Sequence, residues 1–207
     1  MYRVNEIFFT LQGEGAHSGI PAVFVRFSGC NLRCPWCDTD FADYKEMSAS
    51  EIVAEMLSLY DVPNERRKMC VITGGEPSLQ VDTPLIEALH KAGFYICIET
   101  NGTRPLPDGI DWITCSPKEG TKIALKKVNE VKVVFTGTYD PEIWRSEFEA
   151  EHWMLQPLRY NGDLLMESGI DEWSEDNNDN LDETVRYILA HPFWRLSVQL
   201  HKIAGLR

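Results

Sequence analysis

The sequence lacks the segments that direct a protein to a membrane or out of the cell. No run of consecutive apolar residues is long enough to span a bilayer, and the N-terminal residues show no basic segment followed by an apolar stretch and a small-residue cleavage site. The six cysteines would suggest a disulfide framework only in a short secreted chain. We therefore expect a cytoplasmic protein without membrane association.

Positive charge is also scarce. The chain has 20 Lys and Arg residues against 32 Asp and Glu residues, which gives a formal net charge of -12 and a pI near 4.8. Such a protein repels a phosphate backbone, whose binding normally needs clustered lysines and arginines. We therefore expect no direct contact with nucleic acid.

Length and composition favour a single domain. With 207 residues, 43% of them hydrophobic, the chain can bury one sizeable core, and we expect one domain over residues 1–207. An acidic insertion around residues 160–180 interrupts it, because Glu167–Glu183 carries eight carboxylates and no basic residue. This stretch lacks the ordered Asp, Asn and Gly spacing of a calcium loop, which favours a solvated loop over a Ca²⁺ site.

Short β-branched and aromatic runs, bounded by Gly, Pro or polar residues, predict buried strands. These strands are Ala22–Phe27, Met69–Thr73, Phe94–Glu99, Asp111–Cys115, Glu130–Phe135, His152–Gln156 and Arg195–Leu200. Capping boxes at Ser48–Glu51 and Asn180–Glu183, and Pro84, indicate helix starts, and Gly93 suits a helix end. The segments that join the third strand to the fourth, and the fourth to the fifth, show no helical periodicity. The pattern therefore predicts an α/β fold, a partial (open) β/α barrel of about six strands.

Polar or glycine-rich segments follow five of these strands directly. They are Gly29-Cys30, Thr73–Pro77, Glu99–Gly102, Ser116–Lys118 and Gln156-Pro157. In a barrel of parallel strands such ends gather on one face, where these folds carry their chemistry. We expect the five segments to converge on one site.

Cys30, Cys34 and Cys37 lie in one turn-rich loop, with spacings of four and three residues. A structural zinc site needs four ligands, and no second CxxC, CxH or HxxxH pair follows. An iron–sulfur cubane held by three thiolates leaves one iron for an external chelate, so we favour a [4Fe–4S] cluster. The other cysteines lie in apolar runs and are expected to be small buried side chains; they are Cys70, Cys97 and Cys115.

This loop, with Trp36 before its last cysteine, resembles the cluster loop of the radical S-adenosylmethionine (SAM) superfamily, and Thr73–Pro77 resembles its Gly-Gly-Glu-Pro segment. The resemblance implies that the cluster gives one electron to SAM, which yields methionine and a 5′-deoxyadenosyl radical that removes a substrate hydrogen. It places Gly75 at the methionine end and Glu99 and Asn101 at the ribose, although Glu99 could instead pair with a lysine. The implied SAM-binding set is Trp36, Gly75, Glu76, Glu99, Asn101, Ser116, Pro117, Lys118, Gln156, Pro157, Leu158 and Arg159.

Three N-terminal segments resemble the 7-carboxy-7-deazaguanine synthase family, namely Glu6–Gly15, Pro21–Phe27 and Cys37–Phe41. The similarity reaches Gln199–Lys202 and covers essentially the whole chain except the acidic stretch. It implies a carbon–nitrogen lyase that converts 6-carboxy-5,6,7,8-tetrahydropterin to 7-carboxy-7-deazaguanine with loss of ammonia, assisted by Mg²⁺, on the route to queuosine in transfer RNA. It also implies an electron donor such as flavodoxin and a homodimer.

A pterin substrate needs donors for its carboxylate and amide or carboxylate groups for its pyrimidine edge. Arg26 can supply a bidentate fork, and Gln12 and Glu14 can supply the other groups from a glycine-rich loop. The alternatives are a strand-end ion pair for Arg26 and a surface turn for Gln12–Gly15. With the residues that the resemblance implies, the substrate-binding set is Leu11, Gln12, Gly13, Glu14, Arg26, Thr73, His201 and Arg207.

Two further expectations concern Mg²⁺ and the C-terminal tail. Mg²⁺ takes oxygen ligands and keeps several waters, so the Thr39 hydroxyl and substrate oxygens can hold it, with Asp38 and Asp40 as alternatives. The tail His201–Arg207 shows no helical periodicity, so we expect it to stay extended across the pocket mouth with its carboxylate near the substrate. A frayed terminus is the alternative.

Two other classes of protein compete with this interpretation. A glycyl-radical activating enzyme shares the cysteine loop and the Gly-Gly-Glu-Pro segment, but its protein substrate gives no reason for Leu11–Gly15 or for the run after Cys37. An iron–sulfur electron-transfer module needs neither a cofactor pocket nor polar clusters at five strand ends.

Overall fold

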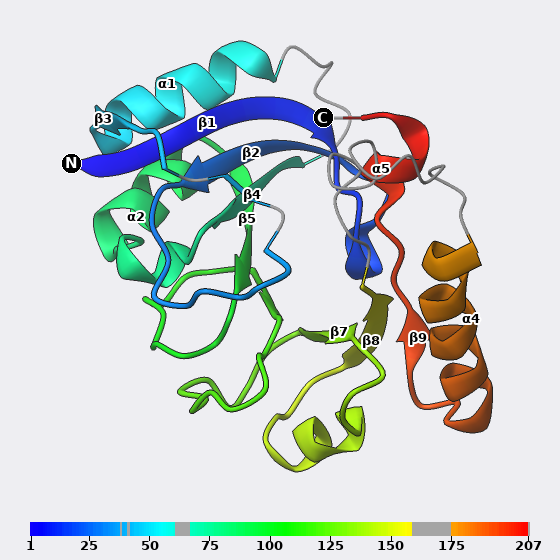
Figure 1. The fold of residues 1–207 in the computed structure, drawn as a ribbon. Helices are drawn as coiled ribbons and strands as arrows, with labels where there is room; N and C mark the ends of the chain where they lie inside the picture. Colours follow the sequence, from blue (N-terminus) through cyan, green and yellow to red (C-terminus); the bar gives the residue numbers. More distant parts are fainter. Residues whose placement is uncertain (38, 41, 61–66, 159–174, 207) are drawn as a thin grey trace.

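A computed structural model describes residues 1–37, 39–40, 42–60, 67–158 and 175–206 of the protein. Within these residues one sheet of nine strands curves around the molecule in the order β3-β1-β2-β4-β5-β6-β7-β8-β9 (Figure 1). The strands are β1 Tyr2–Leu11, β2 Pro21–Phe27, β3 Lys45–Met47, β4 Lys68–Gly74, β5 Phe94–Thr100, β6 Trp112–Cys115, β7 Glu130–Phe135, β8 His152–Pro157 and β9 Arg195–Leu196.

The direction of the strands confirms the predicted open barrel. Every neighbouring pair from β2 to β9 is parallel, whereas β1 runs antiparallel to both β2 and β3. Beside the six predicted strands that form β2 and β4 to β8, the sheet contains β9 and two strands that the sequence pattern did not indicate, β1 and β3. In β1, Arg3, Asn5 and Glu6 interrupt the apolar pattern and the register shifts between Val4 and Glu6, while β3 is only three residues long.

Helices α1 Ala49–Leu59, α2 Thr83–Lys91 and α4 Glu175–Ala190 cover the outside of the sheet. The short helix α5 Leu200–Ala204 lies against the loop after β1. The 3-10 turns are η1 Gly15–His17, η2 Pro77–Leu79 and η3 Pro141–Ser146. The predicted capping box at Ser48 and Glu51 begins α1. Pro84 lies in the first turn of α2, and Gly93, with φ of 84°, follows the end of that helix. As predicted, no helix separates β5 from β6 or β6 from β7, all of whose connecting residues are described.

The acidic stretch differs from the prediction. Helix α4 already begins at Glu175, so Asn180 is not its cap, and the residues from 175 to 183 are helical rather than a loop. The Asn180 amide donates instead to the Phe135 carbonyl at 3.2 Å. Tyr187 and Ile188 of the same helix pack on the core beside β7 and β8, and this tertiary contact supports a helix that composition disfavours. Residues 160–174 lie outside the described part.

The predicted strand Arg195–Leu200 and the predicted extended tail were also wrong. Strand β9 contains only Arg195 and Leu196, and Leu200 begins the short helix α5. The Leu200 amide donates to the Gly13 carbonyl at 2.9 Å, and Gly205 ends the helix in a left-handed conformation with φ of 62°. A five-residue helix is too short to show a periodic sequence pattern.

Two cores lie on the outer face of the sheet, one under α1 and α2 and one between β7, β8, α4 and η3. A smaller cluster lines the inner face, where Phe8 and Phe24 stack with ring centroids 5.1 Å apart. Cys70, Cys97 and Cys115 are buried, as the sequence predicted. Among the described residues no helix has the length and apolar character needed to cross a membrane.

Candidate active site

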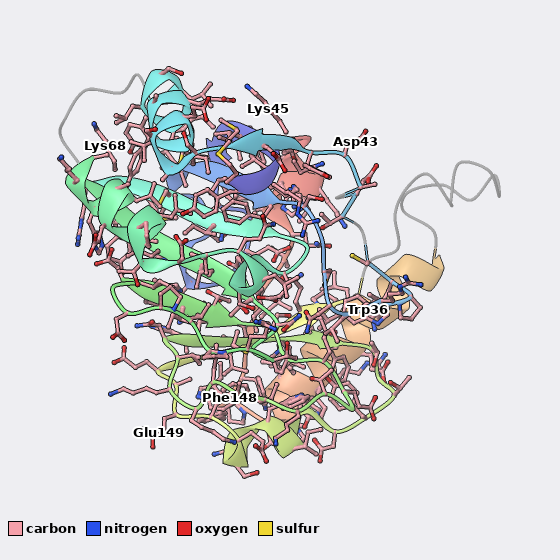
Figure 2. All side chains as sticks on the ribbon, turned by 90° about the vertical axis from the view of Figure 1, so that its left-hand side faces the viewer. Trp36, Asp43, Lys45, Lys68, Phe148 and Glu149 are labelled. Carbon is pink, nitrogen blue, oxygen red and sulfur yellow. The ribbon has the colours of Figure 1, made fainter. Side chains whose placement is uncertain are left out.

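A pocket of about 1190 Å³ opens at the carboxyl ends of the parallel strands. All five predicted polar segments contribute lining residues, and so does the loop after β1. Lys68 at the start of β4 and Trp36 on the cysteine loop lie at opposite sides of the molecule, which shows that this loop lies at the carboxyl edge of the sheet (Figure 2). The predicted convergence is therefore confirmed.

Most predicted site residues line this pocket. Those that do are Leu11, Gln12, Gly13, Glu14, Arg26, Cys30, Cys34, Trp36, Cys37, Thr39, Thr73, Gly75, Glu76, Glu99, Asn101, Ser116, Lys118, Gln156, Pro157, Leu158 and His201. Pro117 lies between two lining residues without lining the pocket itself. Asp38, Arg159 and Arg207 lie outside the described residues. The pocket shows proximity, whereas the individual binding roles remain predictions.

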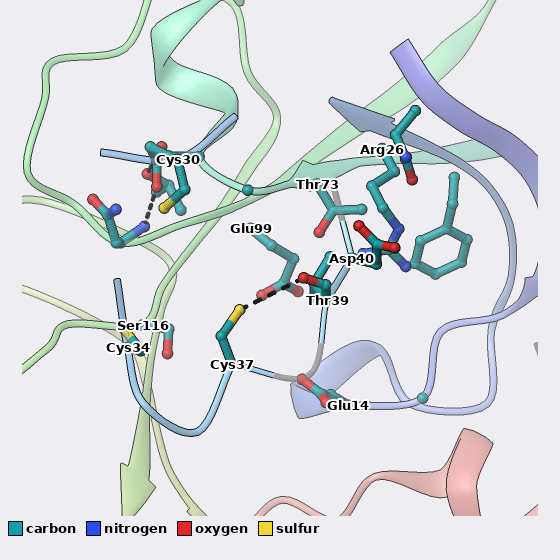
Figure 3. A pocket seen from close by; sticks show the side chains of 18 of the residues that line it. Glu14, Arg26, Cys30, Cys34, Cys37, Thr39, Asp40, Thr73, Glu99 and Ser116 are labelled. Carbon is teal, nitrogen blue, oxygen red and sulfur yellow. Dashed lines mark hydrogen bonds between the residues drawn. The ribbon is translucent and has the colours of Figure 1, made fainter. Parts of the chain in front are cut away.

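The three cysteines of the loop lie along one side of the pocket, with Arg26, Thr73 and Asp40 on the other side and Glu99 between them (Figure 3). Cys30 and Cys34 are half-buried and Cys37 is exposed, in contrast to the three buried cysteines of the core. Burial raises the pKa of the Cys30 and Cys34 thiols, although the Leu32 amide opposes this at Cys30 and the Lys118 charge opposes it at Cys34. The loop is accessible and bears free thiols, as a cluster site requires.

The grouping of possible metal ligands also bears on the choice between zinc and a cluster. Within the described residues, no three His, Cys, Asp or Glu side chains are grouped closely enough to hold a single metal ion. Three cysteines that bind three different irons of a cubane do not need to contact one another, unlike the ligands of one zinc ion. The donor set therefore fits a [4Fe–4S] cluster.

The start of the cysteine loop is joined to the Gly-Gly-Glu-Pro segment through the backbone. The Gly75 amide donates to the Phe27 carbonyl at 3.0 Å, and the Glu76 amide donates to the Gly29 carbonyl at 2.9 Å. A side chain at Gly75 would overlap the Gly29 carbonyl, and one at Gly74 would overlap Phe27 backbone atoms. The glycines are required here because two backbone segments approach each other too closely for a Cβ atom.

Glu76 connects the ends of two neighbouring strands. Its side chain is almost completely buried, and its carboxylate accepts hydrogen bonds from the Thr100 hydroxyl and the Asn101 amide, both at 2.7 Å. It also accepts from the Ser78 amide at 2.9 Å. These contacts fix β4 to β5 at the edge of the pocket.

Asn101 and Lys118 also contact the cysteine loop. The side-chain amide of Asn101 donates to Asn31 Oδ1 at 3.0 Å, and Asn31 is the residue after Cys30. The Lys118 ammonium donates to the carbonyl and hydroxyl of Ser116, both at 2.7 Å, and lies 5.3 Å from the centre of the Trp36 ring. Three strand ends thus support the loop that carries the cysteines.

Arg26 forms the strand-end ion pair that was the alternative to substrate binding. Its Nε atom lies 2.8 Å from Glu6 Oε1, and its guanidinium carbon lies 5.8 Å from the centre of the Phe8 ring. A guanidinium has five N–H donors, and this ion pair uses the one on Nε. Arg26 also lies opposite Thr73 in the parallel pairing of β2 and β4, so both residues border the same part of the pocket.

The Gln12–Gly15 loop is not a surface turn, because Gln12 and Gly13 are buried. The Gln12 side-chain amide donates to Glu99 Oε1 at 3.0 Å, and the Gln12 backbone amide donates to the Ile20 carbonyl at 2.8 Å. The loop therefore turns inward and closes part of the pocket floor. The imidazole of His201 lies against Gly13, where no Cβ atom would fit.

Sequence reasoning missed Lys132, which lines the pocket from β7. Its ammonium lies 2.6 Å from Glu14 Oε2 and 2.9 Å from Glu99 Oε2, so Glu99 does pair with a lysine. The signal was present in the sequence, because Glu130 and Lys132 interrupt an otherwise apolar strand. A charged residue in a buried strand rarely lies there unpaired.

Two of the residues proposed for Mg²⁺ lie beside the cysteine loop. Thr39 and Asp40 both border the pocket, and the Thr39 carbonyl lies 3.9 Å from the Cys37 sulfur. One Asp40 oxygen accepts a hydrogen bond from the Ala42 amide at 3.0 Å. Oxygen donors are therefore available next to the cysteine loop.

An open parallel barrel with three accessible cysteines at the carboxyl ends of its strands is the architecture of a radical SAM protein. The sequence profile of the Radical SAM superfamily matches residues 24–149, and the chain belongs to that superfamily. The structure is similar to the crystal structure of QueE from Escherichia coli, with a TM-score of 0.73 and 28% identity over 97% of this chain and 94% of that one.

Sequence relatives define the family more narrowly. The chain is 47% identical to a 7-carboxy-7-deazaguanine synthase of Bacteroides thetaiotaomicron, with all of both chains covered. It is 42% identical to a protein of the same name from Bradyrhizobium diazoefficiens, over 100% of this chain and 99% of the relative. The chain belongs to the 7-carboxy-7-deazaguanine synthase family.

Proposed function

We propose that this protein is a 7-carboxy-7-deazaguanine synthase, which converts 6-carboxy-5,6,7,8-tetrahydropterin to 7-carboxy-7-deazaguanine and ammonia. One observation carries the proposal. A single pocket joins the three-cysteine loop to a largely buried polar loop, Gln12–Gly15, that offers amide and carboxylate groups to a heterocycle. A protein that only transferred electrons would have no use for this second half.

The cluster half binds the cofactors in this proposal. Cys30, Cys34 and Cys37 hold the cluster, and the bound cluster and SAM together supply the radical that removes a hydrogen atom from the substrate. The strand-end segments after β4, β5, β6 and β8 surround SAM. Their backbone contacts with the cysteine loop, such as that of Gly75 with Phe27, hold the two cofactor sites in a fixed relative position.

The substrate half recognises the pterin. Arg26 binds the carboxylate through N–H groups that Glu6 does not use. Glu14 accepts a hydrogen bond from an N–H group of the pyrimidine edge, and Gln12 orients the loop by its bond to Glu99. The inner wall of Phe8 and Phe24 supplies an apolar surface beside these polar groups and excludes water.

We further propose the remaining properties that the sequence resemblance implies. Mg²⁺ binds at Thr39 and substrate oxygens, an electron donor such as flavodoxin reduces the cluster, and the chain functions as one domain in a cytoplasmic homodimer on the route to queuosine. The reaction class is that of a carbon–nitrogen lyase. For Mg²⁺, Thr39→Val preserves side-chain shape and removes the oxygen, so the variant should need more Mg²⁺ for half-maximal activity.

The test of the main proposal is an anaerobic assay. Reconstituted protein is incubated with reductant, SAM and 6-carboxytetrahydropterin, and the deazaguanine chromophore and ammonia are measured in parallel. Equal amounts of the two products are expected. Cleavage of SAM without either product, under conditions in which the pterin binds, would contradict the proposal.

The activating-enzyme alternative is not favoured, because the relatives named above are all deazaguanine synthases or a structure of QueE. A buried polar loop at Gln12–Gly15 also has no role in recognising a protein backbone.

A further inference from the structure

Lys132 lies at the centre of the substrate half of the pocket, although the recognition scheme above does not use it. Its side chain is only 5% exposed, and its ammonium contacts Glu14 at 2.6 Å and Glu99 at 2.9 Å. These two carboxylates come from the loop after β1 and from the end of β5. Lys132 therefore joins segments that are distant in the sequence.

The strand order explains how a lysine on β7 reaches a glutamate on β5. Glu99 lies opposite Thr114 of β6, and Thr114 lies opposite Glu130 of β7. Because Thr114 has a short side chain, the long Lys132 side chain, two residues beyond Glu130, can extend over β6 to Glu99. Residues at alternate positions of one strand point to the same face, so Glu130 and Lys132 both face the barrel interior.

Glu14 is bound on several sides at once. Besides its contact with Lys132, the Glu14 carboxylate accepts hydrogen bonds from the side-chain amide of Gln199 at 2.9 Å and from the side-chain amide of Gln156 at 3.2 Å. A carboxylate offers about four acceptor positions. Contacts within the described part of the chain use three of them, and the fourth is available to a ligand in the pocket.

The charges around Lys132 are unbalanced. Glu14, Glu99 and the almost completely buried Glu130 surround one ammonium, and Glu130 also accepts the Ala16 amide at 2.7 Å. Burial of Glu14 acts to raise its pKa, but the charge and hydrogen bond of Lys132, the Gln199 bond and the His201 charge together lower it to about 2. Burial raises the Glu99 pKa to about 7, assisted by Glu14 and Glu130 and opposed by Lys132.

We infer that Lys132 is a positioning residue for substrate binding: its ammonium keeps the Glu14 carboxylate charged and fixed beside Glu99, so that Glu14 presents one acceptor to the pyrimidine edge of the substrate. The inference rests on the proposed function for the nature of that substrate. It assigns Lys132 to substrate affinity.

The first experiment compares Lys132→Met with the parent as reconstituted holoenzyme. Without the ammonium, Glu14 is buried beside like charges and takes up a proton, so KM for 6-carboxytetrahydropterin should rise at least about tenfold at pH 7. SAM cleavage without substrate should fall by a smaller factor than KM rises, because Lys132 reaches the SAM side of the pocket only through Glu99. The raised KM should fall again as pH increases and Glu14 ionises, a dependence that a purely structural lesion does not produce.

Lys126→Met is the matched control. Lys126 is 63% exposed, pairs with Glu147 at 2.7 Å and does not line the pocket, so this variant should retain the parent KM and its pH dependence. If Lys132→Met does not fold, the double variant Lys132→Met with Glu99→Gln removes one charge of each sign and relieves the like-charge repulsion. Its KM should remain raised because Glu14 still lacks the ammonium.

A second readout does not depend on turnover. Carbon-13 NMR of glutamate carboxyl groups, with Glu14 assigned by Glu14→Gln, should show Glu14 ionised throughout pH 5–8 in the parent and titrating within that range in Lys132→Met. If Glu14 stays ionised in the variant, or if KM and its pH dependence match the parent, the inference is overturned. If the titration of Glu14 differs in this way between the parent and Lys132→Met, but the parent makes no deazaguanine, the proposed function is contradicted while the role of Lys132 is supported.

Discussion

The cluster half and the substrate half of the pocket are built by different interactions. On the cluster half, backbone hydrogen bonds join the cysteine loop to the Gly74–Glu76 turn, and glycine is required because the two segments nearly touch. On the substrate half, the buried charge of Lys132 and the partly buried charges of Glu14 and Glu99 join a loop to two strands. The first half should therefore be sensitive to side-chain size, and the second to charge and pH.

The largest effect should come from the cluster ligands. Changing Cys30, Cys34 or Cys37 to Ala should abolish cluster binding and all SAM cleavage, because a cubane cannot be held by two of these thiolates. Iron content and 5′-deoxyadenosine formation measure the outcome. The control Cys70→Ala removes a fully buried thiol and should cost only about 1–2 kcal/mol of stability. A Cys70→Ala protein without iron, beside a Cys34→Ala protein with a full cubane, would reverse the ligand assignment.

Gly75→Ala tests the claim that the cluster half depends on close backbone approach. The new Cβ would overlap the Gly29 carbonyl and displace the cysteine loop, so SAM cleavage should fall by roughly 100-fold. Gly120→Ala is the control, because Gly120 has a φ of 75° but open space around it. That variant should lose about 1 kcal/mol of stability and keep its activity. Equal activity in the two variants would show that backbone proximity does not matter.

Arg26→Lys tests the substrate half through geometry at constant charge. The lysine retains the positive charge but loses the planar fork, so substrate affinity should weaken by tenfold or more, about 1.5–3 kcal/mol. Substrate-free SAM cleavage should survive. Arg145→Lys, which changes a surface arginine paired with Glu142, is the control. An unchanged substrate dissociation constant in Arg26→Lys would remove Arg26 from the binding site.

The C-terminal tail should give a smaller effect on the same half. Residues appended after Arg207 should raise KM about three- to tenfold if the terminal carboxylate contacts substrate. Deleting residues 203–207 should raise it similarly, while the bond from the Leu200 amide to Gly13 is retained. A tag before Met1, which is 77% exposed, is the control. Full activity of the C-terminally tagged protein at low substrate would exclude the carboxylate.

The last effect concerns the pH dependence of stability rather than activity. The Glu99 pKa is raised from 4.5 to about 7, so this group contributes stability that is present below pH 4.5 and lost as pH rises through 7. Glu14, whose pKa is lowered to about 2, acts in the opposite sense and loses its contribution as pH falls from 4.5 through 2.

As pH rises from 5 to 8, the stability of Glu99→Gln should therefore increase relative to that of the parent, by at most about 3 kcal/mol. Urea unfolding at both pH values measures the difference, and Glu119→Gln, outside the pocket, is the control. If the difference between Glu99→Gln and the parent is the same at pH 5 and pH 8, Glu99 does not titrate in this range, and the contrast between the two halves weakens.

Local sequence patterns were sufficient for much of the fold and the cluster half. Six parallel strands, the start of α1 and the convergence of five polar segments could all be predicted, because short apolar runs, capping residues and cysteine spacing are local signals. The same patterns failed at α4 and α5. Contact with the sheet supports α4 despite its acidic composition, and α5 is too short to be periodic.

The sequence by itself determined the residue types of the site: three thiolates in one loop, glycines at a strand end, and amide and carboxylate groups after β1. Tertiary structure alone decided the charge arrangement of the substrate half. Lys132 meets Glu14 and Glu99 only because β7 lies two strands from β5 and the loop after β1 folds inward. Such pairing depends on distances across the sheet, and no local pattern encodes them.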